Sequence, residues 1–231
     1  MRDIQKNVDL PPTLKHALYC AQRQTPMQDK LIFHITHVQN LLGIIEAGCL
    51  WSDAKCRELG IGPTNIGYSH IKDRRMRRPI RVGMEGTLGQ YVPFNFCPRS
   101  VMLYVIHQKH ADFNEGQNEI VHLVSTIQTV VTSGREWVFT DIHADLDYAR
   151  HFHDLSELDQ VDWSVMPLQL WRGEETKRKR QAEFLIWDWA PWECVTHIGV
   201  KTNDVALKVQ AMLAAANHKP QVRIKPNWYY Y

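Results

Sequence analysis

The chain has 231 residues, of which 44% are hydrophobic and 23% charged, so it is long enough to bury the core of one domain. No apolar run approaches the roughly 20 residues of a membrane-spanning helix and no hydrophobic signal segment begins the chain, which argues against membrane and secreted proteins. The five cysteines form no CxxC pair, and the net charge of +2 says little about nucleic acid. We therefore expect a soluble cytoplasmic protein without a disulfide framework or a thiolate zinc site.

The polar residues 1–30 are predicted to form an N-terminal extension with a short helix over residues 14–19. A strand over residues 31–35 begins the domain, and Thr36 is placed to cap the helix that follows. Gly48 is expected to end that helix. Its apolar positions recur at i, i+3, i+4 and i+7, namely Val38, Leu41, Leu42 and Ile45.

A region rich in glycine and arginine follows, with a short helix predicted over residues 71–77. The next strand, 91–96, contains Pro93, which cannot donate a ladder hydrogen bond and so requires a sheet edge or a bulge. Ser100 is placed to cap a helix over residues 102–106.

The rest of the chain alternates short strands with short helices, apart from residues 166–180, which lack periodicity and are predicted to form a long loop. Ser125 is expected to cap the first of these helices. The predicted strands are 120–124, 137–140, 183–186, 195–200 and 221–225, and the predicted helices are 127–131, 145–163 and 204–216. This alternation predicts a mixed domain of the α+β or α/β class.

Basic residues concentrate in two segments of this nearly neutral chain. One extends from Lys72 to Arg81, and the other is the run Lys177 to Arg180. Two local clusters of positive charge suit a bound polyanion better than charge spread evenly over the surface does. For the cluster from Lys72 to Arg81, a solvated helix face is the alternative. Glu183 directly follows the second run and opens an apolar strand. It is either an exposed carboxylate, the commoner case, or one held at the edge of a cleft by a rigid sheet.

His34 lies where the first strand meets a helix N-terminus. An imidazole, the Thr36 hydroxyl and free N–H groups at one corner suit a phosphate-bearing ligand, and a buried histidine beside a capping threonine is the alternative. The pairs His34/His37 and His107/His110 do not follow a metal-binding motif, so we expect no metal. No GxGxxG or Walker loop is present, which excludes a dinucleotide held in the Rossmann manner.

Six ordered blocks are typical of one family. They are FHITH at 33–37, YSHIKDRR at 68–75, YVPFNFCPRS at 91–100, FTD at 139–141, QAEFL at 181–185 and WYY at 228–230. Together they resemble the DarT family, the DNA ADP-ribosyltransferase toxins of bacterial DarT–DarG toxin–antitoxin systems. The resemblance covers residues 31–231 and does not explain the extension.

The resemblance implies an ADP-ribosyltransferase-like α+β fold, with a split, bent central β-sheet flanked by helices and NAD in the crevice between its halves. It also implies that ADP-ribose is transferred from NAD to a base in single-stranded DNA, most typically thymidine, which blocks replication. The partners it implies are NAD, single-stranded DNA and a DarG-type antitoxin, with no metal and no membrane.

The same resemblance assigns site residues. The implied catalytic residues are Glu183, Arg75 and His143. The implied NAD-binding residues are His34, Ile35, Thr36, Gly43, Leu50, Arg75, Arg99, Met102 and Tyr104. The expected DNA-binding residues are Arg74, Arg78, Lys177, Arg178, Lys179 and Arg180, and most of these belong to a substrate loop that would run from His143 to Glu183.

The chemistry of Glu183 suits this assignment. Breaking the nicotinamide–ribose bond passes through an oxocarbenium-like state, which a fixed carboxylate stabilises. Glu183 could also take the proton of a thymine ring nitrogen, while Arg75 stabilises the resulting anion or binds an NAD phosphate. Two alternatives remain: a nucleic-acid-binding module with a structural Glu183, or an ADP-ribosyltransferase that acts on another base or on protein.

Overall fold

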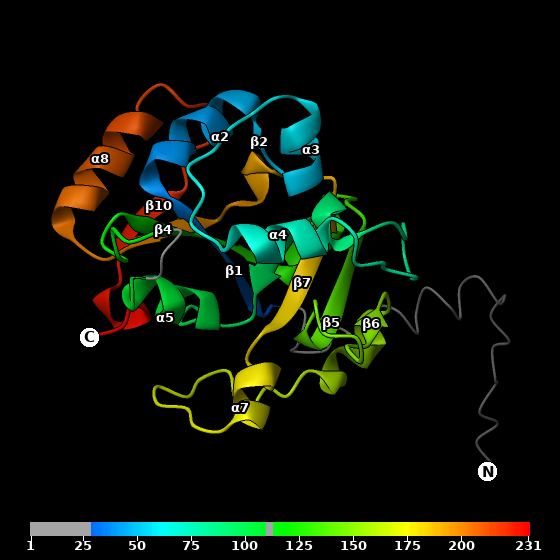
Figure 1. Ribbon diagram of the computed structural model, residues 1–231. Helices are drawn as coiled ribbons and strands as arrows, with labels where there is room; N and C mark the ends of the chain where they lie inside the picture. The colour runs from blue at the N-terminus through cyan, green and yellow to red at the C-terminus, as the bar shows by residue number, and fades with distance from the viewer. Residues whose placement is uncertain (1–28, 110–112) are drawn as a thin grey trace, which may run out of the picture.

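The computed structural model describes residues 29–109 and 113–231 (Figure 1). The helix predicted over residues 14–19 lies outside the described residues, and the boundary between extension and domain at residue 31 stays a prediction. Within the described part, none of the helices is both long and apolar enough to cross a membrane.

An eight-stranded sheet of order β10-β9-β4-β1-β3-β7-β5-β6 forms the centre of the fold, beside a small sheet of β2 and β8. Only β9 and β10 are paired in parallel. The strands are β1 (Leu31–His37), β2 (Cys49–Trp51), β3 (Tyr91–Asn95), β4 (Ile120–Thr126), β5 (Trp137–His143), β6 (His151–Phe152), β7 (Ala182–Trp187), β8 (Trp189–Pro191), β9 (His197–Val200) and β10 (Gln221–Ile224).

The large sheet is split between β1 and β3. These strands share a single register pair, Phe33 with Asn95, whereas β1 pairs with β4 along its full length. Pro93 lies at this split, and its carbonyl oxygen faces the side chain of His34 on β1. The N–H and C=O of a strand residue point to the same side, so the N–H that proline lacks would point toward β1. The ladder between β1 and β3 is open there, so no backbone hydrogen bond is lost. The expectation of an edge strand or a bulge for Pro93 is wrong: β3 lies inside the sheet between β1 and β7, and the proline is accommodated because the ladder between β1 and β3 is open beside it.

Helices cover both sides of the split sheet, and α4 crosses in front of β7 in Figure 1. The α-helices are α2 (Leu41–Ala47), α3 (Asp53–Glu58), α4 (Ser69–Arg75), α5 (Val101–His107), α6 (Ile127–Thr132), α7 (Glu174–Lys179) and α8 (Asn203–Leu213). The 3-10 helices are η1 (Val38–Asn40), η2 (Leu88–Gln90), η3 (Leu155–Gln160), η4 (Trp192–Cys194) and η5 (Pro226–Trp228).

Two predicted helix ends are confirmed. Ser100 caps α5, since its hydroxyl accepts a hydrogen bond from the backbone N–H of Leu103 at 3.1 Å. Gly48 ends α2 in the left-handed region, with φ of 68°, a conformation that costs glycine nothing.

Two predicted caps are wrong by one residue. Thr36 and Ser125 belong to β1 and β4, and the side chains that cap the following helices are those of His37 and Thr126. The reason is that both strands run longer than their apolar cores indicate, because each pairs with the other along all its residues. Cross-strand pairing is not visible in a local window.

The second half of the chain contains the largest errors. The helix predicted over residues 145–163 is wrong: this segment holds only turns, the short β6 and η3. The loop predicted over residues 166–180 ends in a helix, α7. Neither segment has an apolar stripe, so its conformation depends on what it packs against.

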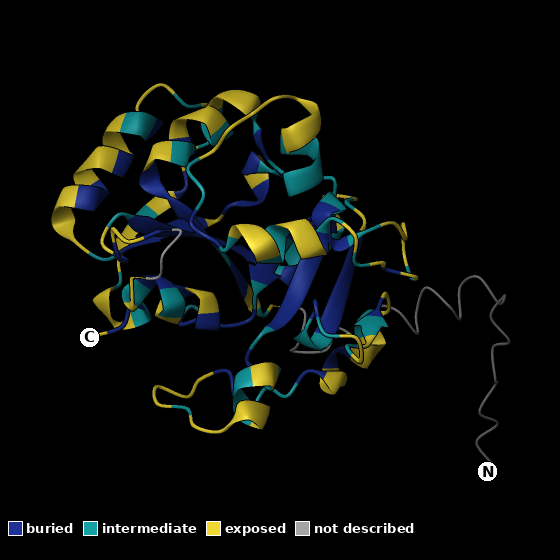
Figure 2. Ribbon diagram, in the orientation of Figure 1, coloured by how far each residue is buried: buried dark blue, intermediate teal, exposed yellow. Residues whose placement is uncertain are grey.

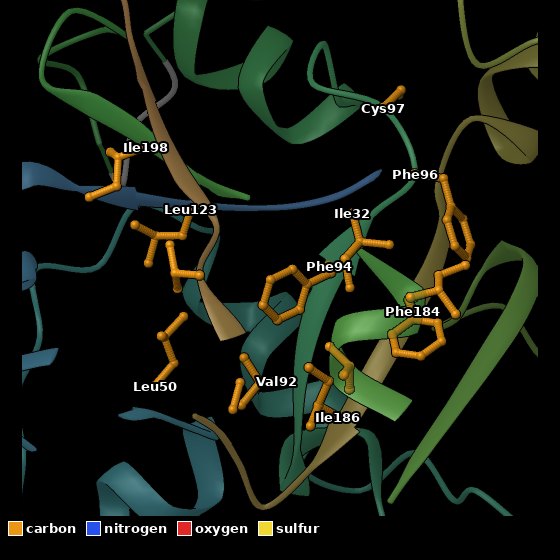
Figure 3. Close-up of a cluster of buried hydrophobic side chains, with 14 of the residues drawn as sticks. Ile32, Leu50, Val92, Phe94, Phe96, Cys97, Leu123, Phe184, Ile186 and Ile198 are labelled. Carbon is orange, nitrogen blue, oxygen red and sulfur yellow. The ribbon is translucent and has the colours of Figure 1, made fainter. Parts of the chain in front are cut away.

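The largest hydrophobic cluster holds β7 in place. Phe184 and Ile186 are 0% exposed and pack in it, next to Phe94 and Val92 of β3 (Figure 3). Figure 2 shows β5 and β7 as buried strands. Because side chains alternate along a strand, Glu183 points away from this cluster. A closely packed core therefore fixes the strand that carries the carboxylate.

Candidate active site

A cavity of about 620 Å³ lies at the split of the sheet, between β1, β3 and β7 and the helices α2, α4 and α5. That volume is in the range of small-molecule and cofactor sites. Its lining includes His34, Ile35, Thr36, Gly43, Leu50, Arg75, Met102, His143 and Glu183. Residues from the first and the second half of the chain, which were predicted to share one NAD crevice, therefore line the same cavity.

The central contact of the cavity is a buried ion pair between Arg75 and Glu183. The two guanidinium Nη atoms donate to the two carboxylate oxygens at 3.0 and 2.9 Å. Arg75 is the last residue of α4, and Glu183 is the second residue of β7. Two parallel bonds fix the carboxylate in orientation as well as position.

Both members of this pair carry their charge at neutral pH. Burial raises the pKa of Glu183, but the charge and hydrogen bonds of Arg75 outweigh burial and hold that pKa below its ordinary value. Burial lowers the pKa of Arg75, and Glu183 more than offsets this. The result is an ionised carboxylate in a place shielded from water, where electrostatic effects are strong.

The end of β5 provides further contacts to Glu183. The backbone N–H of Ala144 donates to Oε1 at 3.4 Å, and the hydroxyl of Thr140 accepts from the Glu183 backbone N–H at 3.0 Å. Nε2 of His143 lies 4.0 Å from Oε1. Burial lowers the pKa of His143, with a smaller opposing effect of Glu183, so the imidazole is neutral at neutral pH.

His34 faces Glu183 from the other half of the sheet. Its Nδ1 lies 2.8 Å from the carbonyl oxygen of Pro93. Burial lowers the pKa of His34, so the ring is neutral. A carbonyl can only accept, so Nδ1 carries the proton and Nε2 is left as an acceptor on a side chain that lines the cavity.

Several cavity residues were missed by sequence reasoning. Asn40 donates to Thr36 Oγ1 and to the carbonyl oxygen of Thr64, both at 3.0 Å, and accepts from the Thr64 N–H at 2.8 Å. It thereby joins β1 to the loop at the cavity rim. Lys72 and Asp53, 2.8 Å apart, also line the cavity. No local pattern distinguishes these residues from ordinary polar ones.

Arg99 and Tyr104, predicted to bind NAD, do not line the cavity. The Arg99 guanidinium donates to Gln169 Oε1 at 2.6 Å and lies 4.5 Å from the ring centre of Tyr230. Tyr104 packs edge-on against Tyr230 and Trp171. Both side chains contact Tyr230 instead: Tyr104 from α5 and Arg99 from the residues before it.

Arg74 of α4 and Arg78, three residues beyond the end of α4, were predicted to bind DNA and lie beside acids of their own chain. Arg74 and Arg78 both pair with the buried Asp145, and Arg78 also pairs with Asp147. Asp145 was missed, since nothing near it in the sequence indicates that it is buried. It holds the helix that carries Arg75 against the end of β5.

Three residues of the second basic run, Lys177, Arg178 and Lys179, are at least partly accessible, and their contact with DNA stays a prediction. Lys177 and Lys179 pair with acids in and around α7, among them Glu174, Glu175 and Asp162. Exposed pairs of this kind are weak and easily exchanged for a phosphate.

The predicted DNA contact of Arg180 is wrong. Its side chain is 0% exposed and donates to backbone carbonyl oxygens, so no part of it can reach a DNA strand. Arg180 lies at the end of α7, where the chain turns inward to start β7.

The described residues contain no group of three or more His, Cys, Asp or Glu side chains that could hold a metal ion.

Residues 33–230 match the family model described as "ssDNA thymidine ADP-ribosyltransferase, DarT". A DNA ADP-ribosyl transferase of Thermus aquaticus is 41% identical over 204 residues, covering 87% of this chain and 89% of the relative. One of Escherichia coli is 32% identical over 208 residues, covering 88% of this chain and 94% of the relative.

Solved structures agree with these matches. The Thermus sp. 2.9 DarT in complex with ADP-ribosylated ssDNA superposes with a TM-score of 0.82 at 38% identity, over 87% of this chain and 97% of that chain. The same protein with NAD+ gives a TM-score of 0.79 at 36% identity, over 89% and 100%. The predicted ADP-ribosyltransferase-like fold is thereby confirmed. The chain belongs to the DarT family, the NAD-dependent thymidine ADP-ribosyltransferases of single-stranded DNA.

Proposed function

We propose that this chain transfers ADP-ribose from NAD to thymidine in single-stranded DNA through Glu183, Arg75 and His143. The observation that supports this assignment is the buried, two-bonded pair of Arg75 and Glu183 at the wall of a cofactor-sized cavity. A charged pair in such a place costs folding free energy, which is typical of functional sites. The Thermus sp. 2.9 structures with NAD+ and with ADP-ribosylated ssDNA support the same substrates here.

The cavity has features that fit the nicotinamide half of NAD. His34 Nε2 and the Thr36 hydroxyl offer hydrogen bonds to ribose or amide, and Leu50 and Met102 offer apolar surface to the ring. A Cβ added at Gly43 would meet nothing within 4 Å, so the missing side chain leaves room for a ligand rather than for the protein. Arg99 and Tyr104 would act on this site through α5 rather than by contact.

The reaction exchanges one N-glycosidic bond for another. The bond between the nicotinamide nitrogen and C1′ of its ribose breaks, and nicotinamide leaves with the electron pair. A thymine ring nitrogen then bonds to C1′ and loses its proton. ADP-ribosylated thymidine, nicotinamide and one proton are the products, so atoms and charge balance.

Glu183 carries two roles in this scheme. Its carboxylate stabilises the positive charge that develops at C1′, and it accepts the thymine proton. Arg75 keeps that carboxylate ionised and oriented before NAD binds. His143, neutral and beside Glu183, would contact the incoming base through a hydrogen bond.

The DNA strand would lie along the basic side chains next to the cavity. Around α7, phosphates can replace the acids that now pair with Lys177 and Lys179, because exposed pairs contribute little. Arg74, whose side chain is half exposed, and Arg78 would contact phosphates while they keep their pairs with the buried Asp145. The residues proposed for this contact are Arg74, Arg78, Lys177, Arg178 and Lys179.

We also propose a DarG-type antitoxin as partner and the bacterial cytoplasm as the place of action. Membership of the DarT family supports the antitoxin as partner. The cytoplasm is supported because NAD and DNA are both present there. An ADP-ribose on thymine would block replication, and a partner that removes it or binds this chain would neutralise the toxin.

The test is transfer of label from NAD to a thymidine-containing single-stranded oligonucleotide by Glu183→Gln. The expected loss in kcat is about 10²–10⁴-fold, the contribution of an electrostatic and acid–base group. Glu193→Gln, an exposed carboxylate on η4, is the matched control. An oligonucleotide without thymidine should stay unlabelled, and a Glu183→Gln rate equal to wild type would refute the assignment.

A further inference from the structure

The guanidinium of Arg180 is sealed inside the protein, outside the cavity. Its Nη1 donates to the carbonyl oxygens of Val165 and Met166, the latter at 3.1 Å. Its Nη2 donates to the carbonyl oxygen of Arg99 at 2.9 Å and lies 3.5 Å from Cys97 Sγ. Three segments that are distant in sequence therefore meet on one side chain.

No carboxylate in the described part of the chain forms an ion pair with Arg180. Its hydrogen bonds go mainly to backbone carbonyl oxygens, and its guanidinium lies 5.8 Å from the ring centre of Trp171. A buried cation without a counter-ion is costly to fold. An apolar residue would fill the same space at lower cost. What arginine adds is a planar fork whose donors fix several acceptors at once, a geometry that lysine cannot reproduce.

Two walls of the cavity begin at this fork. The Arg99 carbonyl precedes α5, whose Met102 lines the cavity, and Arg180 is followed by Gln181 and Glu183, which line it from β7. The hydrogen bond between Arg180 and Arg99 thus sets the distance between the α5 wall and the strand that carries the carboxylate.

The segment before α7 is attached to the same place. The Arg99 side chain donates to Gln169 Oε1 at 2.6 Å, and Trp171 packs edge-on against Tyr104 with ring centres 5.8 Å apart. Residues 165–171 therefore lie against α5. They lead into α7, which carries the partly accessible lysines proposed for DNA.

We propose that Arg180 is a positioning residue that holds the α5 wall, the Glu183 strand and the DNA-side segment 165–179 in one fixed arrangement. The proposal depends on the proposed function only in calling one side of this arrangement the NAD side and the other the DNA side. Loss of the fork would loosen both sides together, so the affinities for NAD and for DNA should fall in the same variant.

The decisive variant is Arg180→Lys, which keeps the charge and loses the fork. Calorimetry should show weaker binding of NAD alone, and the KM for a thymidine oligonucleotide should rise. We expect kcat to fall by about 10²-fold, as misplacement of a reacting group by roughly 1 Å does. Arg223→Lys, an exposed arginine on β10, is the matched control and should leave all three quantities unchanged.

A second variant tests the same junction with little risk to folding. The Tyr230 hydroxyl donates to the carbonyl oxygens of Arg99 and Ser100 at 2.9 and 3.2 Å. Tyr230→Phe removes only that hydroxyl. It should weaken NAD binding by about 3-fold, the effect of one neutral hydrogen bond. The KM for DNA should rise less than in Arg180→Lys, because Arg180 also holds the carbonyl oxygens of Val165 and Met166.

Three results would overturn the proposal. Retention of wild-type NAD affinity by both variants would show that the junction does not shape the cavity. A lower unfolding midpoint with unchanged KM and kcat would show a merely structural arginine. Wild-type activity and DNA affinity in Arg180→Lys, together with a weaker salt dependence of DNA binding in Arg180→Gln alone, would show that Arg180 contacts a phosphate through its charge. The NAD measurement needs no catalysis, so it stands even if the roles of Glu183 and Arg75 prove wrong.

Discussion

Each of the two basic segments contains one buried arginine, and these two arginines differ in which groups offset their charge. Arg75 ends α4 and shares two hydrogen bonds with the Glu183 carboxylate at the cavity wall. Arg180 follows α7 and is surrounded by backbone carbonyl oxygens, away from the cavity. One arginine can face a substrate and the other cannot. The partner of a buried cation, rather than the charge of its neighbours in sequence, indicates its role.

The largest effect should come from Arg75→Met, which leaves Glu183 charged and unpaired. Because breaking a buried pair exposes one partner to an uncompensated desolvation cost, we expect a stability loss of about 3–5 kcal/mol. Activity should fall by about 10²–10⁴-fold, comparable to loss of the carboxylate itself. Urea unfolding and label transfer from NAD measure the two effects. A variant with nearly full activity would show that Arg75 stabilises the fold without taking part in the reaction.

The double variant Arg75→Met/Glu183→Gln should sharpen the contrast. With both charges removed, no unpaired ion remains, so most of the stability lost in Arg75→Met should return. Activity should not return, because the carboxylate is gone. Arg180 allows no such rescue, since its partners are backbone carbonyls. Urea midpoints of the single and double variants decide, and additive losses would contradict a paired charge.

The pH dependence should separate the two arginines as well. The Glu183 pKa is held below its ordinary value of 4.5, so its contribution to stability is present above that pH and is lost as the pH falls through the lower, folded-state pKa. In Arg75→Met burial still raises the Glu183 pKa and only the smaller effects of His143 and Ala144 oppose it, so the acidic limb of kcat/KM should move to higher pH. Arg180→Lys should leave the limb where it is. A rate–pH profile of the three proteins measures this.

The smallest effect is expected for an exposed arginine of the same run. Arg178 lies on α7, 6.0 Å from the ring centre of Tyr148. Arg178→Gln should raise the KM for DNA a few-fold and leave kcat and stability unchanged. The slope of log affinity against log salt should fall by about 0.7, the value for one single-strand phosphate. An unchanged slope would remove Arg178 from the proposed DNA contact.

Local chemistry made part of this structure predictable. Ser100 and Gly48 are recognisable as helix boundaries because a cap or a left-handed residue acts within one turn. Phe184 and Ile186 mark a buried strand because side chains alternate along it. The ordered blocks of residues added the family, and with it the expectation that His34 and Glu183 share a crevice.

Errors arose where a distant partner decides the outcome. The strands β1 and β4 run past their apolar residues because they pair with each other, which moved two helix caps by one position. Residues 145–163 have no apolar stripe, and the helix expected there is mostly turns.

By itself the sequence determined the strand that carries Glu183, the helix caps at Ser100 and Gly48 and, through its ordered blocks, the family. Only the tertiary structure decided that Arg75 meets Glu183 and that Arg180 is buried rather than exposed. Caps and alternation act over a few residues, whereas Arg75 and Glu183 are 108 positions apart. Which arginine is shielded from water depends on how the whole split sheet packs, and no stretch of the chain contains that information.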